Sequence, residues 1–205
     1  GQFTSAIEVI LLQLALADRF RSLSLEHGMI KQSLELAREV QQNLLPNKNP
    51  QFGRLDIAGR SIYCDETGGD YYDFITPDTG ENEQLAIAIG DVSGHGISSA
   101  LLMATVRSSL RQRLSKPGDA GEVISDVNRQ LAHDVEDSGQ FMTMFYLMID
   151  PTKKQLLWVR AGHDPAIFYD PSTDTFEELS GSGVALGVME DSIFKAYTKT
   201  EIRKG

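Results

Sequence analysis

The sequence predicts an α+β protein in which a long N-terminal helix precedes a layered domain of helices and strands. Residues 4–45 contain no proline and repeat apolar side chains at alternating steps of three and four. From Arg54 onward, short runs of strand-like composition alternate with turns, and two amphipathic helices interrupt them. We therefore expect two parts, a helical linker over residues 1–45 and a globular domain over residues 46–205.

The predicted linker helix carries a heptad seam, of which eight of eleven positions are apolar. A helix of about 40 residues is about 60 Å long, too long to lie on a core of this size. We therefore expect a parallel coiled-coil homodimer, although a helix folded back on its own domain would also hide the seam. Polar side chains would hold the register, and Pro46 ends the helix. The seam positions are Val9, Gln13, Leu16, Phe20, Leu23, His27, Ile30, Leu34, Ala37, Gln41 and Leu44.

The domain is predicted to contain five strands and two helices. The first helix runs from about Gly96 to Leu114, and the second opens with Asp119 and Glu122, spaced as in a capping box. Strands followed by helices and strands again, joined by short turns, favour an antiparallel layered fold over a parallel sheet. The strand-like runs are Leu55–Tyr63, Leu85–Ile89, Phe141–Ile149, Gln155–Ala161 and Ile193–Ile202.

Composition narrows the possible partners. The net charge of −10 argues against nucleic acid, which needs a basic face. The single cysteine, Cys64, excludes an intramolecular disulfide and fits a reducing cytoplasm. The longest apolar-biased run, residues 6–17, is shorter than the roughly 20 residues that span a bilayer. We expect the chain as printed to be cytoplasmic.

The acidic residues are unevenly distributed. The stretch Ser61–Val106 contains no lysine or arginine but eight carboxylates. A solvated acidic loop region is one interpretation. The other is that several of these carboxylates converge on a cation, which would relieve their mutual repulsion.

Two glycine-rich aspartate motifs lie within this acidic stretch. Residues 68–73 read Gly-Gly-Asp-Tyr-Tyr-Asp, and residues 90–96 read Gly-Asp-Val-Ser-Gly-His-Gly. Glycines beside an aspartate let the backbone approach a ligand closely. Oxygen ligands without cysteine favour magnesium or manganese over zinc. Turns of this kind are also common as purely structural features. The candidate residues are Asp70 and Asp91 as ligands, with Gly69, Gly90, Gly94 and Gly96 shaping the site.

The two motifs, in this order and spacing, resemble the bacterial PPM phosphatases of the sporulation and stress-sigma-factor regulators. Three other segments share the resemblance: Ala37–Pro46 (AREVQQNLLP), Phe141–Asp150 (FMTMFYLMID) and the Ala-Gly-His turn at Ala161–His163. The similarity runs from about Ala37 to Gly205. It implies an αββα four-layer sandwich with two Mn²⁺ or Mg²⁺ ions between the sheets.

The resemblance also implies roles for individual residues. Asp70 would bind one ion, Asp91 would bridge both, and the backbone carbonyl of Val92 would complete the second. Asp73 would not bind an ion directly and would at most support the ligands from outside the coordination shell. Two such ions lower the pKa of a shared water and orient a phosphoryl group. The expected substrate is phosphoserine or phosphothreonine on a small STAS-like anti-sigma-antagonist protein.

Two histidine turns receive structural interpretations. His95 lies between two glycines and is expected to shape the start of the following helix. His163 matches the family's Ala-Gly-His motif, but Asp164 follows where asparagine is usual, and we interpret that turn as structural.

The N-terminus shows a second resemblance. Residues Glu8–Phe20 (EVILLQLALADRF) are similar to the stretch after the last membrane helix of bacterial seven-transmembrane receptors with intracellular signalling modules. This implies that the chain is the cytoplasmic portion of an inner-membrane receptor.

The chain departs from the family pattern near Gly205. PPM phosphatases supply two further aspartates, one in a Thr-Asp-Gly turn and one at an Asp-Asp strand start, and neither has a counterpart here. We therefore expect the printed chain to bind divalent metal weakly and to be inactive alone. Either the parent protein supplies these ligands, or the chain is a catalytically inactive module that binds a phosphoprotein or transmits signals as a dimer. Intact Asp70 and Asp91 favour the enzyme.

Overall fold

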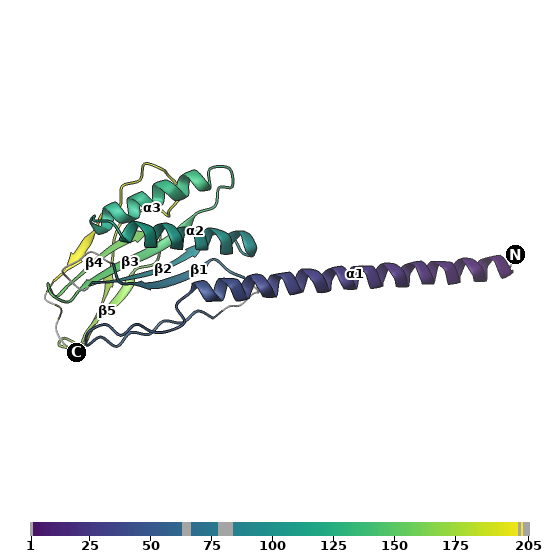
Figure 1. Ribbon diagram of the computed structural model, residues 1–205, viewed down its shortest axis with the longest axis horizontal. Helices are drawn as coiled ribbons and strands as arrows, with labels where there is room; N and C mark the ends of the chain where they lie inside the picture. Colours follow the sequence, from purple (N-terminus) through teal and green to yellow (C-terminus); the bar gives the residue numbers. More distant parts are fainter. Residues whose placement is uncertain (1, 63–66, 78–83, 201, 203–205) are drawn as a thin grey trace.

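The computed structural model describes residues 2–62, 67–77, 84–200 and 202, and Cys64 lies outside them. One long helix is followed by two strands, two helices and five more strands (Figure 1). The elements are α1 (Gln2–Leu44), β1 (Asp70–Ile75), β2 (Leu85–Val92), α2 (Ile97–Leu114), α3 (Ala120–Asp134), β3 (Met142–Asp150), β4 (Gln155–Ala161), β5 (Ala166–Asp170), β6 (Thr175–Leu179) and β7 (Tyr197–Lys199).

Helix α1 projects far from the body of the molecule, and only its C-terminal end lies against the domain (Figure 1). This confirms the predicted long helix. The seam residues Phe20 and Leu23 are 74% and 51% exposed, so nothing in the part of the chain that the structure describes covers them. Gln41 is 3% exposed, because it packs on the domain. Its predicted place in a dimer seam is therefore wrong. No helix in the described ranges is both long and apolar enough to cross a membrane.

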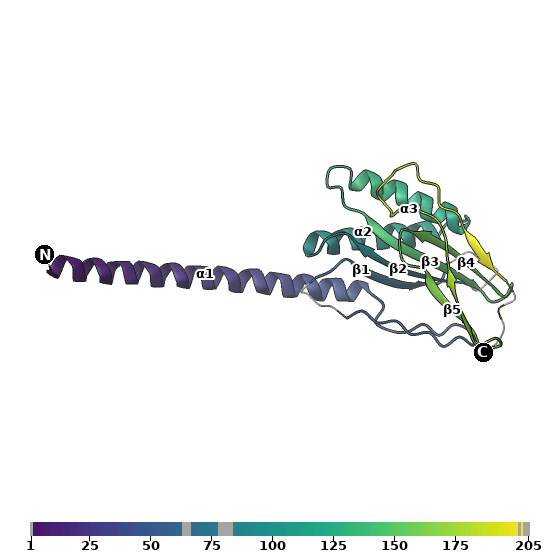
Figure 2. The same ribbon diagram turned by 180° about the vertical axis from the view of Figure 1, so that it is seen from behind.

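The main sheet contains five strands in the order β1-β2-β3-β4-β7, all antiparallel to their neighbours. Helices α2 and α3 cover one face, and the β5–β6 hairpin lies on the other (Figure 2). The described chain is thus an α+β protein with a helix layer, a large sheet and a smaller sheet.

The main core lies between the sheet and the two helices. It is made of alternate strand residues and one apolar stripe from each helix. The capping box at the start of α3 is confirmed: Asp119 accepts from the Glu122 N–H at 2.9 Å, and Glu122 accepts from the Asp119 N–H at 3.1 Å. Fully buried residues of this core include Met103, Val106, Leu110, Ile124, Leu131, Met142, Met144 and Tyr146.

A smaller core covers part of the opposite sheet face. Phe145 and Trp158 pack there against Leu179 of the hairpin, and the Trp158 indole donates to the Ser180 carbonyl at 2.8 Å. Over β2 this face is more open, and Ile89 is 50% exposed. The candidate carboxylates lie on this open part of the sheet.

Two of the predicted strands differ from the observed structure. Residues 55–62 form no strand, and Tyr63 lies outside the described residues. Here Gly59 packs beneath the rings of β1, where an added Cβ would lie 2.8 Å from Tyr72, and its N–H bonds to Asn49. Of Ile193–Ile202, the described part contains only β7 as a strand, because Phe194 turns inward and its N–H donates to Ser125 Oγ at 3.0 Å. The prediction of Gln155–Ala161 is confirmed as printed.

Candidate metal centre

Asp70 and Asp91 lie side by side on neighbouring strands. Asp70 begins β1 and pairs in register with Asp91 near the end of β2. Side chains alternate between sheet faces, so Tyr71 and Val92 point into the helix-side core while both aspartates are exposed on the opposite face. The sheet thus brings together the two carboxylates that the sequence singled out.

The electrostatics of this pair favour a cation. Burial and the negative charge of Asp70 raise the pKa of the Asp91 carboxyl, and nearby His163 partly opposes the shift. The charge of Asp70 thus disfavours the charged form of Asp91, and a divalent cation beside the pair would remove that cost. The oxygen-only character of the pair suits Mg²⁺ or Mn²⁺.

Gly69 keeps the end of β2 close to Asp70. The Val92 N–H donates to the Gly69 carbonyl at 3.2 Å. A Cβ on Gly69 would lie 2.5 Å from the Val92 carbonyl oxygen, so any other residue would push the strands apart. This contact places the Val92 carbonyl, the predicted backbone ligand, beside the residue that precedes Asp70. Gly90 is similarly constrained, because a Cβ there would lie 2.5 Å from the Thr143 carbonyl oxygen.

The turn from β2 into α2 needs two glycines. Gly94 and Gly96 both have φ of +85°, a region that residues with side chains rarely adopt. His95 is exposed between them, at the entrance to α2. Ser93 fixes the start of the turn, since its N–H donates to the Phe141 carbonyl at 2.8 Å and its hydroxyl accepts from the Phe141 N–H at 3.0 Å.

Asp73 faces away from the aspartate pair. It is fully buried on the helix side of β1, where Arg111 of α2 donates to both of its oxygens at 2.6 and 2.7 Å. The Tyr71 hydroxyl donates to it at 3.1 Å, and Arg107 lies 3.8 Å away. The hydrogen bonds from Arg111 raise the pKa of that guanidinium. Asp73 therefore joins β1 to α2 rather than contacting a metal.

Thr143 and His163 lie next to Asp91 on the same sheet face. The sequence did not indicate Thr143, and it led us to interpret the turn at His163 as structural. Thr143 is the register partner of Asp91 on β3, and its Oγ1 lies 2.8 Å from Nδ1 of His163. The signal available in the sequence was that Thr143 is a polar residue within the apolar run of β3.

The predicted ligands are present only as a pair. Among the described residues, no three or more His, Cys, Asp or Glu side chains are grouped so as to hold a metal ion. Five carboxylates of the acidic stretch lie outside the described residues: Asp65, Glu66, Asp78, Glu81 and Glu83.

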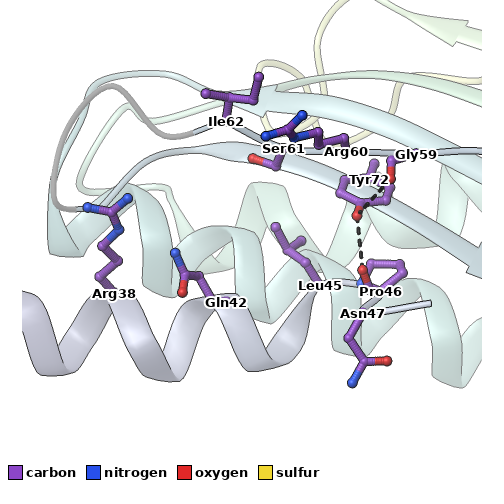
Figure 3. Close-up of a pocket in the computed structure, with 10 residues that line it drawn as sticks. All are labelled: Arg38, Gln42, Leu45, Pro46, Asn47, Gly59, Arg60, Ser61, Ile62 and Tyr72. Atoms are coloured by element: carbon purple, nitrogen blue, oxygen red, sulfur yellow. Dashed lines mark hydrogen bonds between the residues drawn. The ribbon is translucent and has the colours of Figure 1, made fainter. Parts of the chain in front are cut away.

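The end of α1 contacts the chain on both sides of Asp70. The Gln41 amide donates to the Gly68 carbonyl at 2.5 Å and accepts from the Gly68 N–H at 3.3 Å. The Tyr72 hydroxyl donates to the Pro46 carbonyl at 2.9 Å, just after the helix (Figure 3). Beside these contacts lies a cavity of about 470 Å³ between the last turns of α1 and residues 59–62.

Solved structures with the same fold are bacterial PP2C-type phosphatases. The SiaA-PP2C domain of Pseudomonas aeruginosa aligns with a TM-score of 0.65 at 18% identity, over 85% of this chain and 68% of that one. The PP2C phosphatase domain with a regulatory fragment of SpoIIE from Bacillus subtilis aligns at 0.56 and 17%, over 66% and 38%. These alignments identify the class of fold.

The sequence profile described as Stage II sporulation protein E (SpoIIE) matches residues 81–203. This chain belongs to the SpoIIE family. It is 34% identical to the phosphoserine phosphatase RsbU of Bacillus subtilis over 176 residues, which are 86% of this chain and 51% of RsbU. It is 31% identical to the phosphoserine phosphatase RsbP of the same organism, over 85% of this chain and 43% of RsbP. The chain thus spans about half the length of these relatives.

Proposed function

We propose that this chain carries the core of a metal-dependent phosphoserine/phosphothreonine protein phosphatase in bacterial signalling. The observation that supports this most strongly is the pairing of Asp70 with Asp91 across β1 and β2 on an open sheet face. The relatives RsbU and RsbP are phosphoserine phosphatases by name. Membership of their family makes phosphate-ester hydrolysis the chemistry that best fits the pair.

The residues of the site divide the work of hydrolysis. Asp70, Asp91 and the Val92 carbonyl would hold the ions, which when bound supply positive charge to the phosphoryl oxygens and acidify water. In the reaction, the water oxygen bonds to phosphorus, the bond from phosphorus to the serine oxygen breaks, and a water proton ends on the serine. The tight packing at Gly69 and Gly90 would fix the backbone that carries both carboxylates before substrate arrives.

Regulation through α1 forms part of this proposal. Gly68 and Tyr72 lie two residues before and after Asp70, and both bond to the end of the helix. A shift or rotation of α1 would therefore move the backbone that presents Asp70. The exposed seam upstream of Leu34 suits pairing with a second copy of the chain, and the receptor-like segment Glu8–Phe20 suits a tether to a membrane receptor.

The substrate that best fits the family is a small phosphorylated STAS-like regulator. The support is the similarity to two relatives that are named phosphoserine phosphatases and that align with most of this chain. The net charge of −10 argues against nucleic acid as an alternative partner.

The test is hydrolysis of a phosphoserine protein by the natural-length protein in manganese. We expect Asp91→Asn to abolish turnover, because Asp91 would help to hold both ions. Asp70→Asn should lose less, because Asp70 would help to hold only one. Asp137→Asn, a change at an exposed aspartate after α3, is the matched control and should leave turnover unchanged.

The residual turnover of Asp91→Asn decides whether the metal assignment is right. If Asp91→Asn kept more than about a tenth of wild-type turnover, its loss would raise the barrier by less than about 1.4 kcal/mol. Such a small effect is inconsistent with a residue that bridges two catalytic ions, and the metal assignment would be wrong.

A further inference from the structure

We infer that His163 is a positioning residue of this centre, which bonds to Thr143 through one ring nitrogen and uses the other to orient the attacking water. The inference rests on the proposed phosphatase function and extends it to a residue outside the predicted ligand set.

The register of the sheet places His163 at the end of a polar row. Asp70, Asp91 and Thr143 are successive partners across β1, β2 and β3, on the face away from the helices. His163 follows β4, and its Nδ1 lies 2.8 Å from Thr143 Oγ1. Four polar side chains from four neighbouring segments therefore converge on the open face.

The hydroxyl of Thr143 determines which ring nitrogen carries the proton. Thr143 Oγ1 also lies 3.4 Å from the Asp91 carbonyl oxygen, to which only the hydroxyl can donate. We assign the single hydroxyl proton to that carbonyl, which makes Nδ1 of His163 the donor to Oγ1. In the neutral ring this leaves Nε2 without a proton and able to accept a hydrogen bond.

The surroundings favour the neutral ring. Burial is the largest effect and lowers the pKa of His163, and the charge of Arg160 lowers it further. The negative charges of Asp164, Asp91 and Asp70 act in the opposite direction but do not reverse the shift. Burial and Arg160 thus favour the uncharged imidazole.

The backbone around His163 is fixed from several directions. Gly162 has φ of +69°, its N–H donates to the Gly183 carbonyl at 3.0 Å, and a Cβ there would lie 2.8 Å from the Ala185 nitrogen. Arg160 donates to the His163 carbonyl through Nε and to the Gly181 carbonyl through Nη1 at 3.0 Å. These contacts fix the backbone that carries the ring, and the contact with Thr143 orients the ring itself, as a positioning residue requires.

The chemistry assigned to Nε2 is orientation. A water that attacks phosphorus must direct a lone pair along the line of the breaking bond. A bare imidazole nitrogen at the edge of the carboxylate pair can accept one of that water's hydrogens and so fix its direction. Among the described residues, Nε2 has no other hydrogen-bond partner that would compete.

The test compares His163→Asn with wild type in the natural-length protein with manganese. Asparagine keeps a polar group near the position of Nδ1 and removes Nε2. We expect kcat on a phosphoserine protein to fall about 10- to 100-fold, with KM and manganese affinity within about twofold of wild type. His133→Asn, at an exposed position on α3, is the matched control and should change none of these. A kcat within about twofold of wild type would overturn the inference, and so would a parallel loss of manganese affinity.

A second readout needs no catalysis. Ring ¹⁵N resonances of His163 should show a protonated Nδ1 and a bare Nε2, and Mg²⁺ should shift the Nε2 signal. An active enzyme with the opposite tautomer overturns this inference alone. A natural-length wild type that hydrolyses no phosphoprotein overturns the proposed function and this inference together.

Discussion

Asp73 shows how alternation within one short strand separates structural from chemical carboxylates. It lies three residues after Asp70 but on the other face of β1, where it is fully buried and bonded by Arg111. Removing one partner of a buried ion pair leaves the other uncompensated. The same motif thus supplies one exposed carboxylate for the candidate site and one buried carboxylate for the core.

We predict that Asp73→Asn destabilises the fold without directly removing a site residue. The expected loss is about 2 to 3 kcal/mol of unfolding free energy, below the range for fully buried pairs because Arg111 is 40% exposed and can reach water. Urea denaturation would measure it. Asp126→Asn, which breaks an ion pair with Arg113 whose carboxylate is 40% exposed, is the control and should cost less than about 1 kcal/mol. Equal losses in the two variants would contradict the role given to Asp73.

At the scale of elements, the two ends of α1 differ in what they contact. Its upstream seam is exposed at Leu16, Phe20, Leu23 and Ile30, whereas Gln41 is buried against Gly68. A seam of this kind gains stability by pairing with another helix. The buried end, in contrast, ties the helix to the strand that begins with Asp70.

We predict that the chain is a parallel dimer through this upstream seam. Leu23→Asp should give a monomer by sedimentation, because it places a charge in the seam. Leu25→Asp makes the same change at a position that is 61% exposed on the opposite side of the helix, and it should stay dimeric. A dimer that survives Leu23→Asp would place the interface elsewhere.

If the helix regulates activity through Gly68, Leu23→Asp should change the phosphatase activity of the natural-length protein. The same substitution should have no effect on activity in a Gln41→Met background, which lacks both bonds to Gly68.

The elements most predictable from the sequence are those with a strong local pattern. The long helix, the capping box of α3 and the strand Gln155–Ala161 follow from periodicity and caps. The predicted strand at Leu55–Tyr63 fails within its described part because its apolar residues have no neighbouring strand there and Gly59 packs under aromatic rings. Strand β1 was not predicted, because the two glycines before Asp70 are typical of a turn.

The candidate site follows the same rule. Asp70 and Asp91 were predictable because glycines mark both turns and a family resemblance covers both. Their pairing, and the addition of Thr143 and His163, depend on strand register, which a single sequence does not specify. Gln41 was wrongly assigned to the dimer seam, because heptad spacing alone does not distinguish a glutamine that faces a partner helix from one that bonds to a loop of its own chain.

At the scale of the whole molecule, the proposed signal path is short. The exposed stretch of α1 projects from the domain (Figure 1). Gln41 near the end of the helix and Pro46 just after it bond to residues on both sides of Asp70, and Asp70 pairs with Asp91 on the open sheet face. Helices α2 and α3 hold the other face of the sheet and carry the main core. A movement of the linker could therefore reach the candidate ligands without rearranging that core.

The most direct test of the metal assignment is a manganese titration of the natural-length protein by calorimetry, in wild type and in Asp91→Asn. We predict that Asp91→Asn weakens binding by at least about tenfold, or about 1.4 kcal/mol, because it removes the carboxylate that would hold both ions in the proposed site and the repulsion that a cation would relieve. The Asp137→Asn control should bind as wild type does. Manganese affinity that is unchanged by Asp91→Asn would contradict the central claim that this pair of strands forms the metal centre.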